Sequence, residues 1–258
     1  MEQQHHEERF TPEEEASMVA DSNTHKTEAN SLFASGKYDI AINKYDEALA
    51  MLPNYLDYEL AVLRSNIAAC HLKLEEWKEA VKNATDALDS LDKLESSNSK
   101  QDPTPPTEDQ EVEGEIVSSG AKAAGPAIGD DAQRKRQDDI ARIRAKALMR
   151  RARARSELGG WSNLEGAIED YKRLTSLPAY NTLMSATDKK IISTQLRVLP
   201  PRAKAAQEKE TAEMWAKLKD LGNGILKPFG LSTDSFNMVK DEKTGAYSMN
   251  FAGGSGSK

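Results

Sequence analysis

One pattern of apolar residues occurs three times in this chain of 258 residues, and it limits the fold more than any other feature. In each copy, apolar residues three or four positions apart define one helix, a short turn follows, and a second helix has the same spacing. The copies span residues 23–53, about 61–91 and 143–178. A unit of this kind cannot bury its apolar face alone, so the sequence predicts a stack of three helix pairs.

The turns between the paired helices are less regular than the helices. The first copy turns at Gly36 and the third at two glycines, residues 159–160, whereas the second has two glutamates, residues 75–76. In the third copy, residues 162–164 suggest a short insertion between the helices. The apolar spacing resumes in phase after both departures, so neither should abolish the fold.

This arrangement resembles the tetratricopeptide repeat, a helix–turn–helix unit with small and aromatic residues at fixed places. In the first copy, small residues at Ala29, Ala41 and Ala48 alternate with Tyr38 and Tyr45. The resemblance implies that the first helices of the three repeats line a shared groove. We therefore expect an all-α fold of three tetratricopeptide repeat helix pairs plus capping helices, with a short C-terminal extension.

Two further helices are expected after the third repeat, at residues 181–199 and 202–221, with Pro200 and Pro201 between them. Proline lacks the backbone donor of a helix and clashes with the preceding turn, so the two prolines should end the first of these helices. The terminal repeat of such an array needs a cap with one polar face, and the two helices are placed to supply it.

Five polar residues in the expected first helices are the candidate binding residues: Lys26, Asn30, Asn66, Lys146 and Arg150. Lys26 and Asn30 are four positions apart and therefore neighbours on one helix face, as are Lys146 and Arg150. Ammonium, guanidinium and amide donors can together hold a chain-terminal carboxylate and an adjacent aspartate. We expect Lys146 and Arg150 to be solvated in the free protein.

Members of the tetratricopeptide-repeat family that bind the chaperones Hsp90 and Hsp70 use the same residue types at the matching places, as a carboxylate clamp. The resemblance therefore implies a chaperone adaptor that binds the acidic C-terminal tail of Hsp90 or Hsp70. A scaffold that binds another acidic peptide is the alternative. Taken singly, each lysine is most simply a solvated surface charge; the functional interpretation depends on all five occurring together.

A basic run follows in the third copy, where Arg151, Arg153 and Arg155 come directly after the last clamp residue. Such a run can indicate nucleic-acid binding. The net charge of −7 and the lack of interleaved aromatic residues argue against it, and Arg153 is assigned to an extension of the positive groove. The sequence has no nucleophile–base arrangement, phosphate-binding glycine loop or metal-ligand spacing of histidines, so it predicts neither an enzyme nor a metal or cofactor site.

The segments outside the repeats differ in composition. Residues 1–20 are acidic and polar and are expected to be disordered, and residues 95–134 are rich in Ser, Pro, Gly and acidic residues, which predicts a flexible insertion in a repeat domain spanning 21–221. No apolar run approaches the roughly 18–20 residues that span a bilayer. The N-terminus is unlike a signal peptide, and the chain has one cysteine, so we expect a cytoplasmic protein that binds no membrane.

The C-terminal segment, residues 222–258, has apolar and aromatic residues beyond the expected cap. Its β-prone runs, 236–240 and 246–251, are separated by a polar segment ending in glycine, which is compatible with a hairpin. The segment either packs on the helical domain or docks a partner, such as a client or a signalling or translation-related protein. The candidate docking residues are Phe229, Phe236, Tyr247, Met249 and Phe251.

Overall fold

The computed structural model describes residues 9–98, 129–229, 233, 236–240 and 247–251. The chain divides into two compact units, residues 1–203 and 204–258. The helices of the first unit are, in chain order, α1 (Pro12–Ala34), α2 (Tyr38–Ala50), α3 (Asp57–Lys73), α4 (Trp77–Asn98), α5 (Gly129–Leu158), α6 (Trp161–Ser176), α7 (Tyr180–Leu183) and the first part of α8 (Ala186–Leu226).

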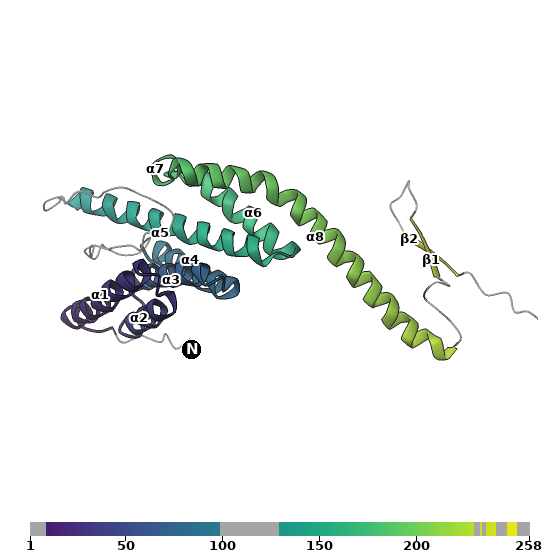
Figure 1. The fold of residues 1–258 in the computed structure, drawn as a ribbon, viewed down its shortest axis with the longest axis horizontal. Coiled ribbons are helices and arrows are strands. Elements are labelled where there is room, and N and C mark those ends of the chain that lie inside the picture. Colours follow the sequence, from purple (N-terminus) through teal and green to yellow (C-terminus); the bar gives the residue numbers. More distant parts are fainter. Residues whose placement is uncertain (1–8, 99–128, 230–232, 234–235, 241–246, 252–258) are drawn as a thin grey trace, which may run out of the picture. The chain divides into compact units, whose positions relative to one another are not determined.

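The first unit is a stack of three helix pairs, α1–α2, α3–α4 and α5–α6 (Figure 1). Each helix packs against the next in the chain, and the first helices α1, α3 and α5 also contact one another in that order. The expectation of an all-α repeat fold with three helix pairs is therefore confirmed. The contact between α3 and α5 brings together residues as far apart in the sequence as Ser65 and Arg150, which are 85 positions apart.

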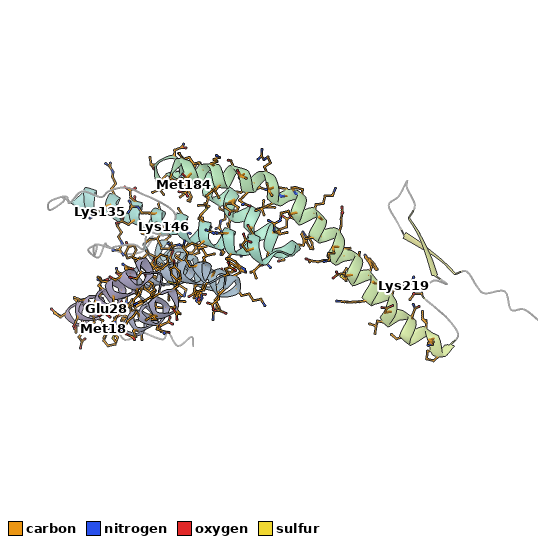
Figure 2. All side chains as sticks on the ribbon, viewed as in Figure 1. Met18, Glu28, Lys135, Lys146, Met184 and Lys219 are labelled. Atoms are coloured by element: carbon orange, nitrogen blue, oxygen red, sulfur yellow. The ribbon has the colours of Figure 1, made fainter. Side chains whose placement is uncertain are left out.

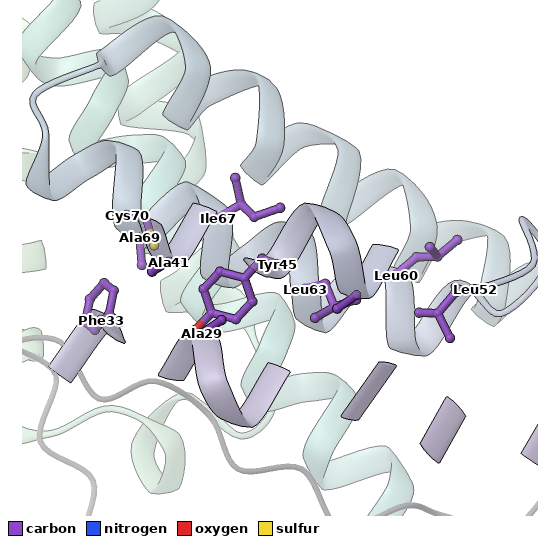
Figure 3. Packing of buried hydrophobic residues seen from close by; sticks show 11 residues of the cluster. Ala29, Phe33, Ala41, Tyr45, Leu52, Leu60, Leu63, Ile67, Ala69 and Cys70 are labelled. Carbon is purple, nitrogen blue, oxygen red and sulfur yellow. The ribbon is translucent and has the colours of Figure 1, made fainter. Parts of the chain in front are cut away.

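Small residues and one large aromatic ring fill the core of the first pair. Ala29, Ala41 and Ala48 have no exposed surface, and neither has Tyr45, whose ring lies among them (Figure 3). Phe33 packs edge to face against Tyr38, with 5.1 Å between the ring centroids. Burying a side chain of this size stabilises the fold by roughly 1.5–3 kcal/mol, so the small–large pattern in the sequence is a packing pattern.

The turns of the three pairs share one backbone conformation. Gly36 and Gly159 have left-handed φ angles of 76° and 67°, and Glu75 of the second pair has φ 59°. A residue with a Cβ atom adopts this region at a cost of roughly 1–2 kcal/mol. The second turn therefore keeps the shape of the others without glycine, which explains why the apolar spacing resumes in phase.

The expected insertion at residues 162–164 is wrong. These residues lie in the first turn of α6, which begins at Trp161, and Leu164 is buried. Two successive glycines, both with positive φ, complete the turn before the helix starts, so no further residues are needed between the helices.

The expectation that disorder extends to residue 20 is wrong for the part of this segment that forms α1. Thr11 caps the helix: its Oγ1 accepts from the Glu14 backbone N–H at 3.3 Å, and its own N–H donates to the Glu14 carboxylate at 2.9 Å. Tyr55 also donates to Glu15 at 2.7 Å, which ties the first turn to the loop after α2. Residues 1–8 lie outside the described residues.

The expected insertion at 95–134 begins later and ends earlier in the structure. Helix α4 continues to Asn98, and α5 begins at Gly129 rather than near residue 143. The additional turns of α5 are held by Ile140, which packs with Tyr58 and Leu91. Residues 99–128, the remainder of the expected insertion, lie outside the described residues.

The expected helix break at the two prolines is wrong, because α8 runs without interruption through Pro200 and Pro201. Both prolines are exposed, whereas Leu199 and Ala203 on either side of them have no exposed surface. Packing on both sides thus holds the helix across the missing backbone donors, which ordinarily cost about 3 kcal/mol or more. One helix therefore stands where two capping helices were expected.

The second unit, residues 204–258, contains the rest of α8, the 3-10 helix η1 (Lys227–Phe229) and strands β1 (Phe236–Lys240) and β2 (Tyr247–Phe251). The strands pair antiparallel, from Phe236 opposite Phe251 to Lys240 opposite Tyr247, so the expected hairpin pairing is confirmed. The division between units falls at 203/204, before the expected boundary at residue 222. No described helix is both long and apolar enough to span a membrane.

Candidate peptide-binding groove

The five candidate binding residues lie on the three first helices, which contact one another. Lys26 and Asn30 are on α1, Asn66 is on α3, and Lys146 and Arg150 are on α5 (Figure 2, which labels Lys146). A hydrogen bond and an electrostatic interaction connect Asn30 to Arg150 through Tyr45, and Lys26 and Lys146 each lie one helical turn before one of these two residues.

Asn30 is oriented by the second helix of its own repeat. Its Oδ1 accepts a hydrogen bond of 2.6 Å from the hydroxyl of Tyr45. Burial raises the pKa of the Tyr45 hydroxyl far above its ordinary value, so this group stays protonated and donates. With the amide oxygen engaged by Tyr45, the NH2 group is the part of Asn30 that suits an anionic ligand. Lys26, one turn earlier, is only 5% exposed.

Arg150 joins the third repeat to the second. It is 7% exposed, and its Nη1 donates to the backbone carbonyl of Ser65 at 2.7 Å and to the Ser65 hydroxyl at 2.6 Å. The expectation that Arg150 is solvated is therefore wrong; Lys146 is half-buried. The length and planar guanidinium of arginine let it reach α3 and remain hydrogen-bonded, and sequence spacing on one helix could not reveal a partner 85 positions away.

The charge of Arg150 also reaches the core of the first repeat. It lowers the pKa of Tyr45 and of Cys70, but burial has the larger effect on both and raises the pKa of the Cys70 thiol to about 12. Cys70 is therefore a protonated, buried core residue. Because Tyr45 also bonds Asn30, these interactions place Asn30, Arg150 and Ser65 in one neighbourhood.

Asn66, the residue after Ser65, has an unsatisfied donor. Its side chain is 2% exposed, and its Nδ2 is buried without a hydrogen-bond acceptor. Leaving such a donor unpaired costs roughly 1–3 kcal/mol. A ligand oxygen bound in the groove would remove this penalty, and a carboxylate would do so with a charge-assisted bond. The sequence identified the residue but not this property.

The other basic residues of α5 have different surroundings. Arg153 is exposed and lines a cavity together with Arg150, and its assignment to an extension of the groove stays a prediction. Arg151 and Arg155 instead bond Asp170 of α6. Arg151 makes two bonds to this carboxylate, of 3.0 and 2.7 Å, and Arg155 makes one of 2.8 Å. Sequence analysis missed Asp170, whose side chain is 1% exposed.

Asp170 therefore gives Arg151 and Arg155 a structural role. Two guanidinium groups surround a buried carboxylate, which leaves these arginines committed to the packing of α5 on α6. Among the described residues, no group of three or more His, Cys, Asp or Glu side chains is arranged to hold a metal ion. The groove offers donors and positive charge, which suits anion binding.

Comparison with known proteins supports the repeat family. The chain is 38% identical over 76 residues to small glutamine-rich tetratricopeptide repeat-containing protein 2 of Saccharomyces cerevisiae, an alignment that covers 30% of this chain and 20% of the relative. It is 36% identical over 62 residues to human mitochondrial import receptor subunit TOM70, covering 24% of this chain and 10% of the relative. No family model matches the chain.

The chain thus spans a fifth or less of the length of these relatives. A solved structure, the Hsp90 co-chaperone Cns1 from Saccharomyces cerevisiae, aligns over 82% of this chain and 48% of its own, with a TM-score of 0.42 and 15% identity. That likeness is too low to bear on function. The sequence matches show similarity over less than a third of this chain, in one case to a tetratricopeptide repeat-containing protein, so the ligand is inferred from the residues of the candidate site.

Proposed function

We propose that this protein is a chaperone adaptor whose groove binds the acidic C-terminal tail of Hsp90 or Hsp70. Lys26, Asn30, Asn66, Lys146 and Arg150 form the carboxylate clamp, and Arg153 extends its positive field. The protein acts by binding in the cytoplasm, without catalysis or cofactor.

The observation that carries the proposal is the buried Nδ2 of Asn66, which has no acceptor within the protein. Ser65, the residue before Asn66, holds the guanidinium of Arg150, so a positive charge lies against the same turn of α3. A terminal carboxylate is the ligand group that supplies both an acceptor oxygen and a compensating negative charge. The net charge of the chain is −7, so the attraction for an anion comes from the local arrangement.

A peptide ending in Glu-Glu-Val-Asp tests the proposal directly. Fluorescence anisotropy should give a micromolar Kd, which corresponds to about −8 kcal/mol or weaker. The matched control is the same peptide with an amidated C-terminus, which should bind much more weakly because the clamp would lose the charge that it holds. Equal binding of the two peptides would show that the clamp assignment is wrong.

The alternative is a scaffold whose groove binds a different acidic peptide. Competition with a scrambled acidic peptide that keeps a free C-terminus separates the two functions. If the scrambled peptide competes as well as Glu-Glu-Val-Asp, the groove binds acidic tails in general and the chaperone assignment fails. If it does not compete, the scaffold function loses its support.

A second binding function is proposed for the C-terminal segment. Residues 221–236 are similar to the corresponding part of tetratricopeptide repeat protein 1, and we propose that Phe229, Phe236, Tyr247, Met249 and Phe251 dock a client or signalling partner. The pairing of β1 with β2, which aligns Phe236 with Phe251, favours an ordered docking element. Deleting residues 231–258 should leave peptide binding and the melting temperature unchanged. A large fall in melting temperature would assign the segment to packing instead.

A further inference from the structure

A cavity of about 540 Å³ adjoins the clamp within the first unit. It lies between the C-terminal parts of α1, α3 and α5, together with α6 and the first part of α8. Arg150 belongs both to the clamp and to the cavity wall, so a peptide held at the clamp by its terminal carboxylate reaches the cavity with a residue farther from its end. Much of the wall is apolar, with Phe33, Leu72, Met149 and Ile191 among the lining residues.

Helix α8 contributes an unsatisfied acceptor to this cavity. The Asp188 side chain has no exposed surface, and its Oδ2 accepts from the Ser185 hydroxyl at 2.6 Å and the Ser185 backbone N–H at 3.3 Å. Its other oxygen, Oδ1, is buried without a donor. A buried carboxylate oxygen with no donor is costly, because burial removes its hydration without replacing it.

A second acceptor lies on the same face of α8. Gln195 is seven residues after Asp188, which is close to two helical turns, so both side chains project to one side. Gln195 also lines the cavity, and its Oε1 is buried without a donor. The wall that faces the repeats thus presents two acceptors, and the wall formed by the repeats has both apolar and charged residues.

The charges of the cavity decide which donor it suits. Its lining includes the cations Lys73, Arg150 and Arg153 and the anions Glu157 and Asp188, so positive charge is in excess. A lysine or arginine of a ligand would meet this excess at close range. An uncharged hydroxyl can donate to one of the two acceptors, and an amide NH2 to one or both, without that repulsion.

We propose that this cavity is a specificity subsite for the peptide bound at the clamp, and that it takes an apolar side chain ending in an uncharged hydrogen-bond donor, as in tyrosine. One of the two acceptors, Asp188 Oδ1 or Gln195 Oε1, accepts the single hydroxyl proton, and the apolar part of the wall holds the ring. This subsite rests on the proposed function, since the clamp sets the position of the peptide. Tyrosine at one position of the tail is therefore favoured over phenylalanine.

Paired peptides test the subsite. Tyrosine or phenylalanine is placed at each of the three positions before Glu-Glu-Val-Asp in turn, and binding to the full chain is measured by anisotropy. At one position, tyrosine should bind roughly tenfold more tightly, as a hydrogen bond to a charged acceptor predicts. One of two variants should reduce this ratio severalfold and so identify the acceptor: Gln195→Met, or Asp188→Asn, which keeps the oxygen that Ser185 contacts. Gln207→Met, at an exposed position of α8, is the matched control and should leave the ratio unchanged.

The possible results are distinct from those that test the clamp. If tyrosine and phenylalanine bind equally at all three positions while amidation still abolishes binding, the clamp stands and the subsite is wrong, with water as the partner of the two acceptors. A preference for tyrosine that neither variant reduces also overturns the subsite. If amidation changes nothing, the proposed function itself fails.

Discussion

Arg150 and Arg151 are adjacent in α5, yet they belong to two different parts of the molecule. Arg151 is satisfied within the protein by two bonds to Asp170 of α6 and by one of 3.3 Å to Thr85 of α4. Arg150 faces α3, where it bonds the neutral oxygens of Ser65 beside the unsatisfied Nδ2 of Asn66. Both arginines are 7% exposed. Burial is therefore the same, and the difference lies in whether the surrounding polar groups are satisfied.

That difference separates a site that stabilises the fold from one that is suited to a ligand. Around Asp170, each charge has its partner, and removing one member leaves another uncompensated. Around Asn66, the donor Nδ2 has no acceptor, so the site is less stable without ligand than with it. Substitutions around Asp170 should therefore lower stability and leave peptide binding intact, whereas substitutions around Asn66 should lower peptide affinity more than stability.

The largest expected effect is that of Asp170→Ala. It removes the common partner of Arg151 and Arg155 and leaves two guanidinium groups at a buried site, which should lower the free energy of unfolding by about 3–5 kcal/mol. Urea denaturation measures this loss. The folded protein should still bind the acidic peptide, because the clamp lies on the other side of α5.

Glu169→Ala is the matched control, since Glu169 is exposed and precedes Asp170 in the same helix. Its effect should stay within about 0.5 kcal/mol. A similar loss for both variants, or a loss of peptide binding in folded Asp170→Ala, would remove the distinction between the two sides of α5.

Arg150→Ala should weaken peptide binding by about 1.5–3 kcal/mol, the range for a hydrogen bond to a charged group. Its bonds to Ser65 also join α5 to α3, so the free energy of unfolding should fall by roughly 1 kcal/mol. Titration calorimetry and urea denaturation on the same preparation measure the two effects. Lys146→Ala removes a half-buried side chain one turn away and should weaken peptide binding with little change in the free energy of unfolding. Unchanged peptide binding in both variants would exclude α5 from the clamp.

Asn66→Leu should change stability and binding in opposite directions. It replaces an unsatisfied buried donor with an apolar group of similar size, so the free energy of unfolding should stay constant or rise by up to about 1 kcal/mol. Peptide affinity should fall by roughly tenfold, because the ligand loses one donor. Asn43→Leu, at an exposed position of α2, is the control for a general effect of the substitution. A marked loss of stability in Asn66→Leu would mean that Nδ2 has a partner in the free protein.

The repeat architecture could be predicted from the sequence because the buried face of each helix appears as apolar residues three or four positions apart. Ala29 and Tyr45 could be assigned to one core from their positions alone, and Lys26 and Asn30 to one face of α1. The partners across the structure could not be predicted, since nothing in the spacing of α5 indicates that Arg150 bonds Ser65 or that Arg151 bonds Asp170. Local rules failed where packing overrode them.

The uninterrupted α8 shows such an override. Pro200 and Pro201 predict a break from backbone chemistry alone, but the burial of Leu199 and Ala203 outweighs it. The start of α1 is the reverse case, because the acidic composition of residues 1–20 concealed the capping signal of Thr11 and Glu14. In both places, specific contacts outweighed a general rule, one from proline chemistry and one from composition.

The smallest expected effect is at the start of α1, where the polar groups are satisfied but exposed. Hydrogen bonds from the backbone and then the side chain of Thr11 lower the pKa of Glu14 below its usual 4.5. A carboxylate with a lowered pKa in the folded state stabilises the fold above its unfolded pKa, and this contribution disappears as the pH falls through the folded value. Glu14→Ala should therefore speed amide hydrogen exchange in residues 12–20 by roughly two- to fivefold near neutral pH, as expected for a weakened cap.

Below the folded pKa of Glu14, the two proteins should exchange more nearly alike once the intrinsic pH dependence is removed. Exchange in α5 and α6 should not change at either pH, because this cap lies far along the chain from Asp170. A difference in exchange that persisted undiminished at low pH would show that the carboxylate charge does not hold the cap. A loss of stability in Glu14→Ala as large as that in Asp170→Ala would show that burial does not set the cost of breaking a satisfied pair.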